Sequence, residues 1–278
     1  MIRAILDGVE RSHQLETLLA TKDPVVMGII NVTPDSFYDG GASETAIYNR
    51  VDAMTAAGVA IIDIGAESTR PGATPVPAHV ERERLAAYLP HIMSRTTALI
   101  SVDTYKPSVA DYALSEGAVL INDISGGESP DMLATVARHG AGIVLMHKQG
   151  DIPTMQNNPV YADPIHDVYH YLKHRYAAAT AAGIRSIIID PGIGFGKTRA
   201  HNTAILQGLS ALQSLKAPIM VGVSRKSFIG DITGAPAADR LPGTIAATTI
   251  SYMNGARLFR VHDVAETIQA LAVCQALR

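Results

Sequence analysis

The sequence has no tryptophan, only 5% aromatic residues and a single cysteine, Cys274. One cysteine cannot form an internal disulfide, so the chain is unlike small secreted domains that disulfides hold together. Runs of basic residues are also absent and the net charge is -3, which argues against a protein that binds nucleic acid or an anionic membrane. Any anion bound by this protein is therefore expected to be small and held by a few local side chains.

Long apolar runs are missing as well. The start of the chain, MIRAILDGVERSHQLE, lacks the continuous apolar core of a signal peptide, and no other stretch has the roughly 20 apolar residues of a membrane-spanning helix. These absences predict a cytoplasmic protein. Hydrophobic residues make up 47% of the 278 positions and charged residues 18%, which favours a large buried core over disorder.

Short apolar runs recur along the chain, and a segment with helical periodicity follows each of them. Every run is apolar at nearly all positions, which is typical of parallel strands buried on both faces. Several intervening segments, such as SETAIYNRVDAMTAAG, end in glycine as helices do. The predicted strands are residues 25–31, 60–66, 98–104, 119–125, 142–147, 186–190, 218–224 and 258–263.

These repeated β-then-α units, with no linker between them, predict an α/β fold that is a single (β/α)8 TIM barrel. A doubly wound open sheet is the alternative, but it more often has about five to seven strands and a reversal point in the strand order. We assign residues 1–24 to a short N-terminal extension that covers the bottom of the barrel and residues 25–278 to the barrel.

Polar residues gather at the carboxyl ends of the predicted strands, where (β/α)8 barrels carry their active sites. Each of them alone is explained equally well as the N-cap of the next helix. Their convergence on one rim favours a binding or catalytic site. The residues are Asn31, Glu67–Arg70, Asp103, Asn122–Asp123, Met146–His147, Asp190, Ser224–Lys226, Arg260 and His262.

The motif DPGIGFGKT, residues 190–198, resembles a phosphate-binding P-loop, in which a glycine and four further residues precede Gly-Lys-Ser/Thr. Pro191 occupies the position of that first glycine, and proline has no amide N–H to donate. We expect instead that the glycines let the backbone pass close to a flat ligand held by Asp190.

Two further features are predicted to carry no chemistry. The segment HDVYH, residues 166–170, resembles the zinc motif H-E-x-x-H, but it has Asp for Glu and lacks an apparent third ligand. We expect it far along a helix on the outside of the barrel. Cys274 lies in the apolar pattern of the last helix, without the base or positive charge that a reactive thiol needs.

Taken in order, the strand-end motifs strongly resemble one family, the dihydropteroate synthases. The matching motifs are INVTPDSFYDGG, GAESTRPGA, SVDT, INDISGG, LMH followed by TMQ and NP, IDPGIGFGK, VGVSRKSFIG and RVHDV. The resemblance implies an eight-stranded (β/α) barrel that condenses (7,8-dihydropterin-6-yl)methyl diphosphate with 4-aminobenzoate in folate synthesis. It also implies a Mg²⁺-dependent homodimer that sulfonamides inhibit.

The resemblance also implies roles for individual residues. For the pterin ring the matching positions are Asp103, Asn122, Met146, Asp190 and Lys226, and for 4-aminobenzoate they are Thr69, Phe195, Lys226 and Ser227. For diphosphate they are Arg70, Arg260 and His262, and for Mg²⁺ they are Asn31 and Asp39. A carboxylate such as Asp190 can accept two adjacent N–H donors of an amino-pyrimidinone edge, and the Arg260 guanidinium can stack on the ring.

The implied reaction begins with departure of diphosphate, after which the amine of 4-aminobenzoate attacks the remaining cation. Catalysis would then depend on Asp39, Arg70, Lys226, Arg260 and His262. The segment 32–43 resembles the mobile loop of the family, which closes over the substrates and brings a carboxylate to Mg²⁺.

Two other functions compete with this one. A methyltetrahydrofolate-binding corrinoid methyltransferase domain shares the pterin-binding barrel, but it has no need for the SRKS and RVHD residues or for the NVTPDSF loop. A pterin-binding relative without catalytic activity is the second alternative. The intact set Asn31, Asp39, Arg70, Lys226, Arg260 and His262 argues against it.

Overall fold

The computed structural model describes residues 8–33, 44–68 and 72–277. Its parallel strands are β1 (Val25–Asn31), β2 (Ile61–Gly65), β3 (Leu99–Asp103), β4 (Leu120–Asp123), β5 (Gly142–Met146), β6 (Ile187–Asp190), β7 (Met220–Val221) and β8 (Leu258–Val261). They form one sheet in the order β6-β5-β4-β3-β2-β1-β8-β7. A parallel bridge between Ile189 and Ile219 joins the two edges, so the sheet is a nearly closed barrel. The prediction of a TIM barrel is confirmed, and the open-sheet alternative is wrong.

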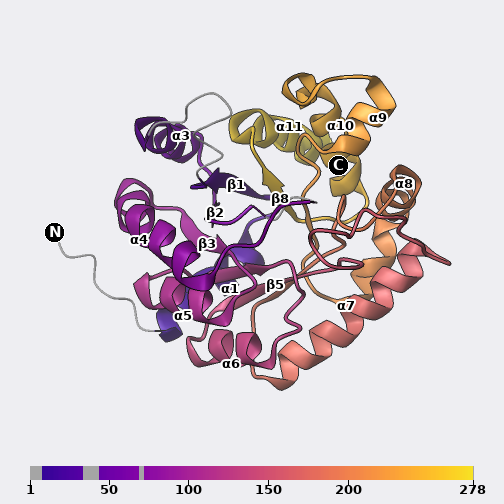
Figure 1. The fold of residues 1–278 in the computed structure, drawn as a ribbon. Helices are drawn as coiled ribbons and strands as arrows, with labels where there is room; N and C mark the ends of the chain where they lie inside the picture. Colours follow the sequence, from indigo (N-terminus) through magenta and orange to yellow (C-terminus); the bar gives the residue numbers. More distant parts are fainter. Residues whose placement is uncertain (1–7, 34–43, 69–71, 278) are drawn as a thin grey trace.

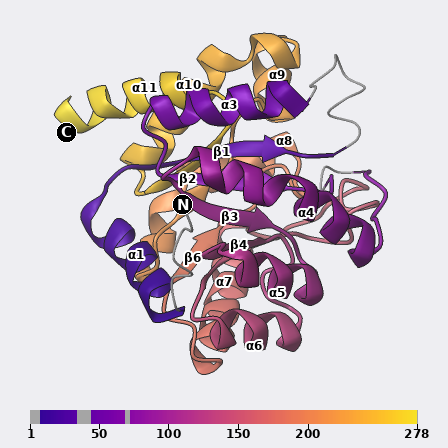
Figure 2. The same cartoon turned by 90° about the vertical axis from the view of Figure 1, so that its left-hand side faces the viewer.

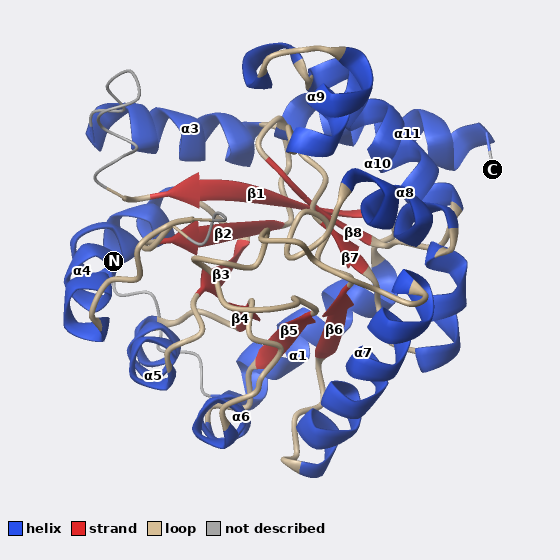
Figure 3. Cartoon of the chain, turned by 45° about the vertical axis from the view of Figure 1, so that its right-hand side comes forward, coloured by secondary structure: helices blue, strands red, loops and turns tan. Residues whose placement is uncertain are grey.

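Helices alternate with the strands and surround the sheet (Figure 1). The α-helices are α1 (Gly8–Thr21), α3 (Glu44–Ala56), α4 (Ala78–Arg95), α5 (Pro107–Glu116), α6 (Pro130–Arg138), α7 (Pro164–Ala181), α8 (Arg199–Gln207), α9 (Ser227–Thr233), α10 (Leu241–Met253) and α11 (Val264–Leu277). Two 3-10 helices, η1 (Leu209–Leu215) and η2 (Ala237–Asp239), complete the outer layer. Figure 3 shows the helices arranged around the strands, as the sequence pattern predicts.

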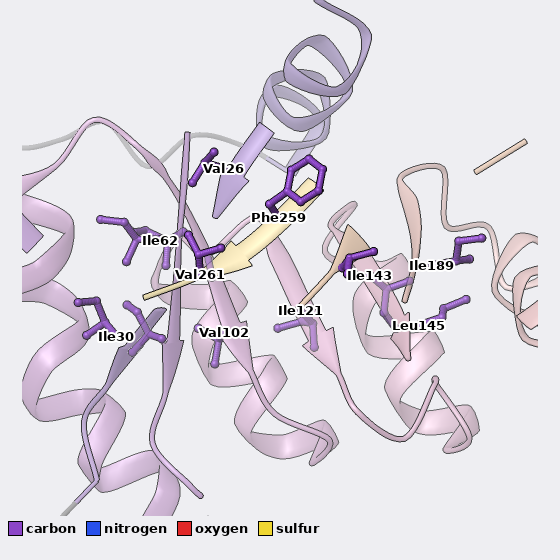
Figure 4. Close-up of a cluster of buried hydrophobic side chains, with 14 of the residues drawn as sticks. Val26, Ile30, Ile62, Val102, Ile121, Ile143, Leu145, Ile189, Phe259 and Val261 are labelled. Atoms are coloured by element: carbon purple, nitrogen blue, oxygen red, sulfur yellow. The ribbon is translucent and has the colours of Figure 1, made fainter. Parts of the chain in front are cut away.

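The larger apolar cluster lies between the sheet and the helices. It takes alternate residues of the strands, for example Ile62 and Ile64 of β2 and Val102 of β3, and Figure 4 shows part of it around Phe259. Successive residues of a strand point to opposite faces, so the residues between them point into the barrel. Burial of each of these large side chains contributes roughly 1.5–3 kcal/mol.

A second apolar cluster fills the amino-terminal part of the barrel. It contains Ile61, Leu120 and Leu258 from the strands together with Leu15 of α1, which is fully buried. Gly142 allows this contact, because a Cβ atom there would lie 2.4 Å from Cδ2 of Leu15. Helix α1 therefore packs at the end of the barrel where the strands begin (Figure 2).

Strand β7 is much shorter than the predicted run 218–224. Pro218 has no N–H for the ladder, although its carbonyl accepts a hydrogen bond from Ile189 N at 3.0 Å. After Val221 the chain turns, with Lys226 N donating to Val223 O and Arg225 at a φ of 57°. The apolar residues beyond Val221 are thus buried in a turn and not in a strand.

The HDVYH segment lies in the first turns of α7, so its predicted position far along a helix is wrong. Asp163 caps this helix by accepting hydrogen bonds from the backbone N–H groups of Ile165 and His166. The helix lies outside the barrel, and the His166 side chain is 64% exposed. Within the described ranges, no group of three or more His, Cys, Asp or Glu side chains is placed to hold a metal ion. None of the helices described by the structure has the length and apolar character needed to cross a membrane.

Candidate active site

The polar residues at the strand ends continue the inward-facing rows of the barrel. In β8 the inward row is Leu258, Arg260 and His262, because Phe259 and Val261 belong to the outer cluster. The same alternation turns Asn31, Asp103, Asn122, Met146 and Asp190 inward. Period-two alternation therefore places seven of the predicted site residues, Arg260 and His262 among them, at one end of the barrel interior.

Arg260 is the centre of a buried charge network. Its Nε donates to Oδ2 of Asp63 at 2.6 Å, and its Nη2 donates to Oδ2 of Asp103 at 2.8 Å. Asn122 donates from Nδ2 to the same Asp63 oxygen at 3.0 Å. Asp63 is fully buried and Asp103 nearly so, while the Arg260 side chain stays 21% exposed. The network therefore holds the guanidinium in place while part of the side chain remains exposed.

Both carboxylates of this network retain an unused oxygen. Oδ1 of Asp63 and Oδ1 of Asp103 are buried and accept no hydrogen bond within the part of the chain that the structure describes. Buried acceptors without a partner are costly, so a ligand that donates N–H groups to these two oxygens would be stabilised here. Burial raises the pKa of Asp103 to about 7, against the lowering influence of the Arg260 charge.

Asp63 belongs to the candidate site, and the sequence analysis missed it. It lies in the middle of β2 and not at a strand end, so the search for strand-end residues passed over it. The signal was nevertheless present, because a carboxylate in the run IIDIG, all of it buried, needs a charged or donating partner.

A second group of residues lies at the end of β6. Oδ1 of Asp190 accepts a hydrogen bond from Gly192 N at 2.7 Å, and burial raises the pKa of Asp190 while the Lys226 charge opposes this. The Nζ of Lys226 lies 4.5 Å from the centre of the Phe195 ring and donates to Ile193 O. Burial lowers the pKa of Lys226 to about 8, and the nearby Asp190 opposes that shift. The structure thus brings a carboxylate, an amine and an aromatic ring together.

The loop after β7 is fastened to the end of β8. Arg225 donates from Nε and Nη2 to the two carboxylate oxygens of Asp263, at 2.9 and 2.5 Å. Ser224 Oγ lies 3.0 Å from Nδ1 of His262 and accepts a hydrogen bond from its backbone N–H. These contacts fix His262 and, one residue beyond Arg225, Lys226. Ser227 follows directly as the first residue of α9.

Met146 and Phe195 belong to a small apolar cluster above the barrel interior. Its other members are Tyr105, Ile124, Ile152 and Met155. Met146 pairs with Asp190 in the register of β5 and β6, so this apolar group adjoins the Asp190 carboxylate. A flat ring bound here would meet apolar side chains and a carboxylate at the same time.

Asn31, the last residue of β1, lies near Asp103. A Cβ atom on Gly65 would be 3.2 Å from Oδ1 of Asn31 and 3.9 Å from Oδ2 of Asp103. Amide and carboxylate oxygens are the ligands that Mg²⁺ accepts, and this ion commonly completes its shell with substrate phosphates and water. Asn31 therefore fits the predicted metal site. Asp39, Thr69 and Arg70 lie outside the described residues.

Two of the three glycines of the 190–198 motif are needed for packing of the chain itself. A Cβ atom on Gly192 would lie 1.8 Å from His147 O, and one on Gly196 would lie 2.3 Å from Gln149 O. Both glycines have positive φ, 67° and 61°. They let the turn pack against the chain after β5, so the expectation that they make room for a flat ligand is wrong for these two positions. Lys197 points into the protein, where it is 3% exposed.

This geometry defines a class of protein. The rim joins unused buried acceptors to an arginine, a lysine and an apolar wall, which is the chemistry of a barrel enzyme for a flat heterocycle with several N–H donors and an attached anion. Comparison with known proteins agrees. Residues 27–262 match the family model described as pterin binding enzyme.

Curated relatives and solved structures narrow the family. The chain is 42% identical to dihydropteroate synthase of Escherichia coli (strain K12) over 264 residues, 94% of each chain. The solved Yersinia pestis dihydropteroate synthase with a sulfonamide drug complex has a TM-score of 0.86 and 40% identity, covering 92% of this chain and 94% of that one. The Xanthomonas albilineans enzyme with 4-aminobenzoic acid has a TM-score of 0.86 and 42% identity, covering 92% and 93%. The chain belongs to the dihydropteroate synthase family of pterin-binding enzymes, and the resemblance inferred from the motifs is confirmed.

Proposed function

We infer that the protein is a transferase that condenses (7,8-dihydropterin-6-yl)methyl diphosphate with 4-aminobenzoate to give 7,8-dihydropteroate and diphosphate. The pair of unused oxygens on Asp63 and Asp103, beside Arg260 and Asn122, is the observation that carries this proposal. A pterin presents adjacent amino and ring N–H groups, which such oxygens can accept.

The pterin ring would lie between the two groups of polar residues. Asp190 and Asn122 offer acceptors to the amino-pyrimidinone edge, while the Lys226 ammonium can donate to the ring carbonyl or a ring nitrogen. Met146 supplies an apolar wall. The Arg260 guanidinium, held by Asp63 and Asp103, can stack on the ring and face the departing diphosphate.

The reaction starts when the bond between the pterin methylene carbon and the diphosphate oxygen breaks, and diphosphate leaves with the electron pair. Arg260 and His262 stabilise the departing negative charge, together with Arg70. The amine nitrogen of 4-aminobenzoate then bonds to the methylene cation and loses a proton. An aromatic amine is already neutral at pH 7, so no strong base is required. Asn31 and Asp39 would hold a Mg²⁺ ion, whose charge would offset that of the diphosphate.

The 4-aminobenzoate side would be formed by the loops after β6 and β7. Phe195 offers a ring face, and Lys226 and Ser227 offer donors at the start of α9. Thr69 would contribute from the loop after β2. This placement would bring the amine close to the pterin methylene group across the mouth of the barrel.

The protein is further proposed to form a homodimer through its late helices. Ile250 and Met253 of α10 and Val273 and Leu277 of α11 are each at least 55% exposed, and these two helices pack together. Exposed apolar side chains of this size, gathered on neighbouring elements, are typical of an interface. Light scattering after gel filtration tests this proposal, because Met253→Glu should yield a monomer where the parent yields a dimer.

Release of diphosphate from the pterin substrate, measured with and without 4-aminobenzoate, tests the proposed reaction. We expect release that depends on 4-aminobenzoate and equals the dihydropteroate formed. A relative without catalytic activity would bind the pterin and release nothing. Methyl transfer from a methylated folate to a cobamide, with no diphosphate release, would indicate the corrinoid alternative.

A further inference from the structure

Lys197 is a buried amine that the proposed reaction does not use. Its Nζ lies 2.9 Å from His147 Nδ1 and donates to His147 O at 3.2 Å and to Phe195 O at 3.0 Å. Two of these three partners belong to the residue that follows β5, and the third is the main chain of Phe195. The side chain therefore links the turn after β6 to the end of β5.

The link holds whichever of the two side chains carries the proton. Burial lowers the pKa of Lys197 well below its ordinary value, and burial together with the Lys197 charge lowers the pKa of His147 to about 3. An ammonium would donate to all three partners. A neutral amine would donate to the two carbonyl oxygens and accept from Nδ1–H of His147. In both states Lys197 Nζ keeps its contacts with His147 Nδ1, His147 O and Phe195 O.

The turn that Lys197 holds determines where the Phe195 ring lies. Phe195 N donates to Gly192 O at 3.1 Å, and Phe195 O accepts from the Lys197 amine. The ring then faces Lys226 at 4.5 Å. Gln156 adds a more exposed support, since it donates to Gly194 O and accepts from Lys197 N.

Asp190 is held differently, although it is only five residues from Phe195. It lies within strand β6, opposite Met146 in the register of β5 and β6. Its carbonyl accepts a hydrogen bond from His147 N at 2.9 Å. These backbone contacts do not involve the Lys197 side chain. The Asp190 carboxylate also accepts a hydrogen bond from Gly192 N at the start of the turn. Loss of the Lys197 amine should therefore displace Phe195, to which the amine donates directly, further than Asp190, which the strand ladder also holds.

We propose that Lys197 is a positioning residue for the 4-aminobenzoate side of the site, where it fixes the Phe195 turn against the end of β5. This role rests on the proposed function, because it assigns Phe195 to 4-aminobenzoate and Asp190 to the pterin. It goes beyond that function because it says that different contacts hold the two subsites, the Lys197 side chain for Phe195 and the strand ladder for Asp190.

Steady-state kinetics of Lys197→Met tests the proposal, since methionine fills the apolar part of the cavity without the amine. We expect the KM for 4-aminobenzoate to rise at least about tenfold, because small displacements of positioning groups have large kinetic effects. The KM for the pterin substrate and the Kd of a pterin, measured by calorimetry, should stay within about threefold. Lys148→Met is the matched control, since Lys148 is the neighbouring and more exposed amine, bonded to Gly150 O. It should leave both KM values unchanged.

His147→Ala provides a second variant in case Lys197→Met folds poorly. It removes one of the three partners while the two carbonyl acceptors remain, so the same KM should rise by a smaller factor. Equal changes in the KM for both substrates, or no change in either, would overturn the positioning role.

Amide hydrogen exchange of the free protein, followed by mass spectrometry, separates this proposal from the proposed function. In Lys197→Met, residues 193–197 should exchange faster than in the parent, while strand β6 exchanges at the parent rate. If the parent releases no diphosphate, the proposed function fails, yet faster exchange of the turn still supports the link. If the parent is active and the variant keeps both its KM values and its exchange, only the positioning role fails.

Discussion

Replacement of Asp63 by asparagine should show how much the buried charge network around Arg260 contributes to the stability of the barrel. The side chain is fully buried, and one of its oxygens accepts from both Arg260 and Asn122. Asparagine keeps the shape and one acceptor, but it removes the charge that balances Arg260. It also places an N–H₂ group where the unused Oδ1 now lies.

The expected loss of stability follows from these contacts. An unsatisfied buried donor costs about 1–3 kcal/mol, and breaking a buried ion pair by changing one partner costs about 3–5 kcal/mol. Asp103 still pairs with Arg260 in the variant, so we expect the low end of that range, about 3 kcal/mol in the free energy of unfolding. A pterin should also bind more weakly, because an acceptor has become a donor.

Urea denaturation of Asp63→Asn, analysed by linear extrapolation, measures the first effect, and calorimetry with a pterin measures the second. Asp52→Asn is the control, since Asp52 pairs with Arg95 at 2.9 Å but is 47% exposed. An exposed pair contributes about 0–1 kcal/mol. If the two variants lost the same stability, Arg260 would not depend on Asp63 and the reasoning would be wrong.

Three further predictions concern the site. Asp190→Asn should weaken pterin binding by about 1–3 kcal/mol in calorimetry, because an amide has one acceptor where the carboxylate has two; an unchanged Kd would remove Asp190 from the pterin site. Lys226 is charged below its pKa of about 8 and neutral above it, so pterin affinity should fall by about tenfold between pH 7 and pH 9. Lys226→Met should lack that step, and a parent profile identical to that of the variant would contradict the assignment. Asp39→Ala should keep pterin affinity within a few-fold and lower turnover by roughly 100-fold, and parental turnover at limiting Mg²⁺ would refute its metal role.

Much of the fold was predictable because its signals are local. Buried parallel strands must be apolar on both faces, so a continuous apolar run such as VVMGII can be recognised as a strand from the sequence. The predicted length of β7 was too great, because apolar residues occur wherever the chain is buried, whether or not it pairs with a neighbouring strand. Val223 is fully buried in a turn, and an apolar pattern cannot distinguish that from a strand.

The candidate site was predictable where function coincides with a strand end. Asp103, Asn122 and Asp190 follow from that rule, and the structure turns all three into the barrel. Asp63 was missed because its role depends on Arg260, almost 200 residues away in sequence and adjacent only in the closed barrel. The glycines at 192 and 196 were misread for a similar reason, since the chain they approach comes from another strand.

The junction between β6 and β7 has a consequence for how such a protein can change over time. Ile219, directly before β7, forms a parallel bridge with Ile189 of β6. The loops after the two strands carry Phe195 on one side and Lys226 on the other. Because β6 and β7 pair only briefly, side-chain contacts such as the hydrogen bond from Lys226 to Ile193 O set the spacing between these loops. Mutations in the loops can therefore alter the fit of an aminobenzoate analogue without breaking strand pairing. We expect variants with altered discrimination between such analogues to arise at this junction more readily than at β1 and β2, where a long ladder fixes the chain up to Asn31.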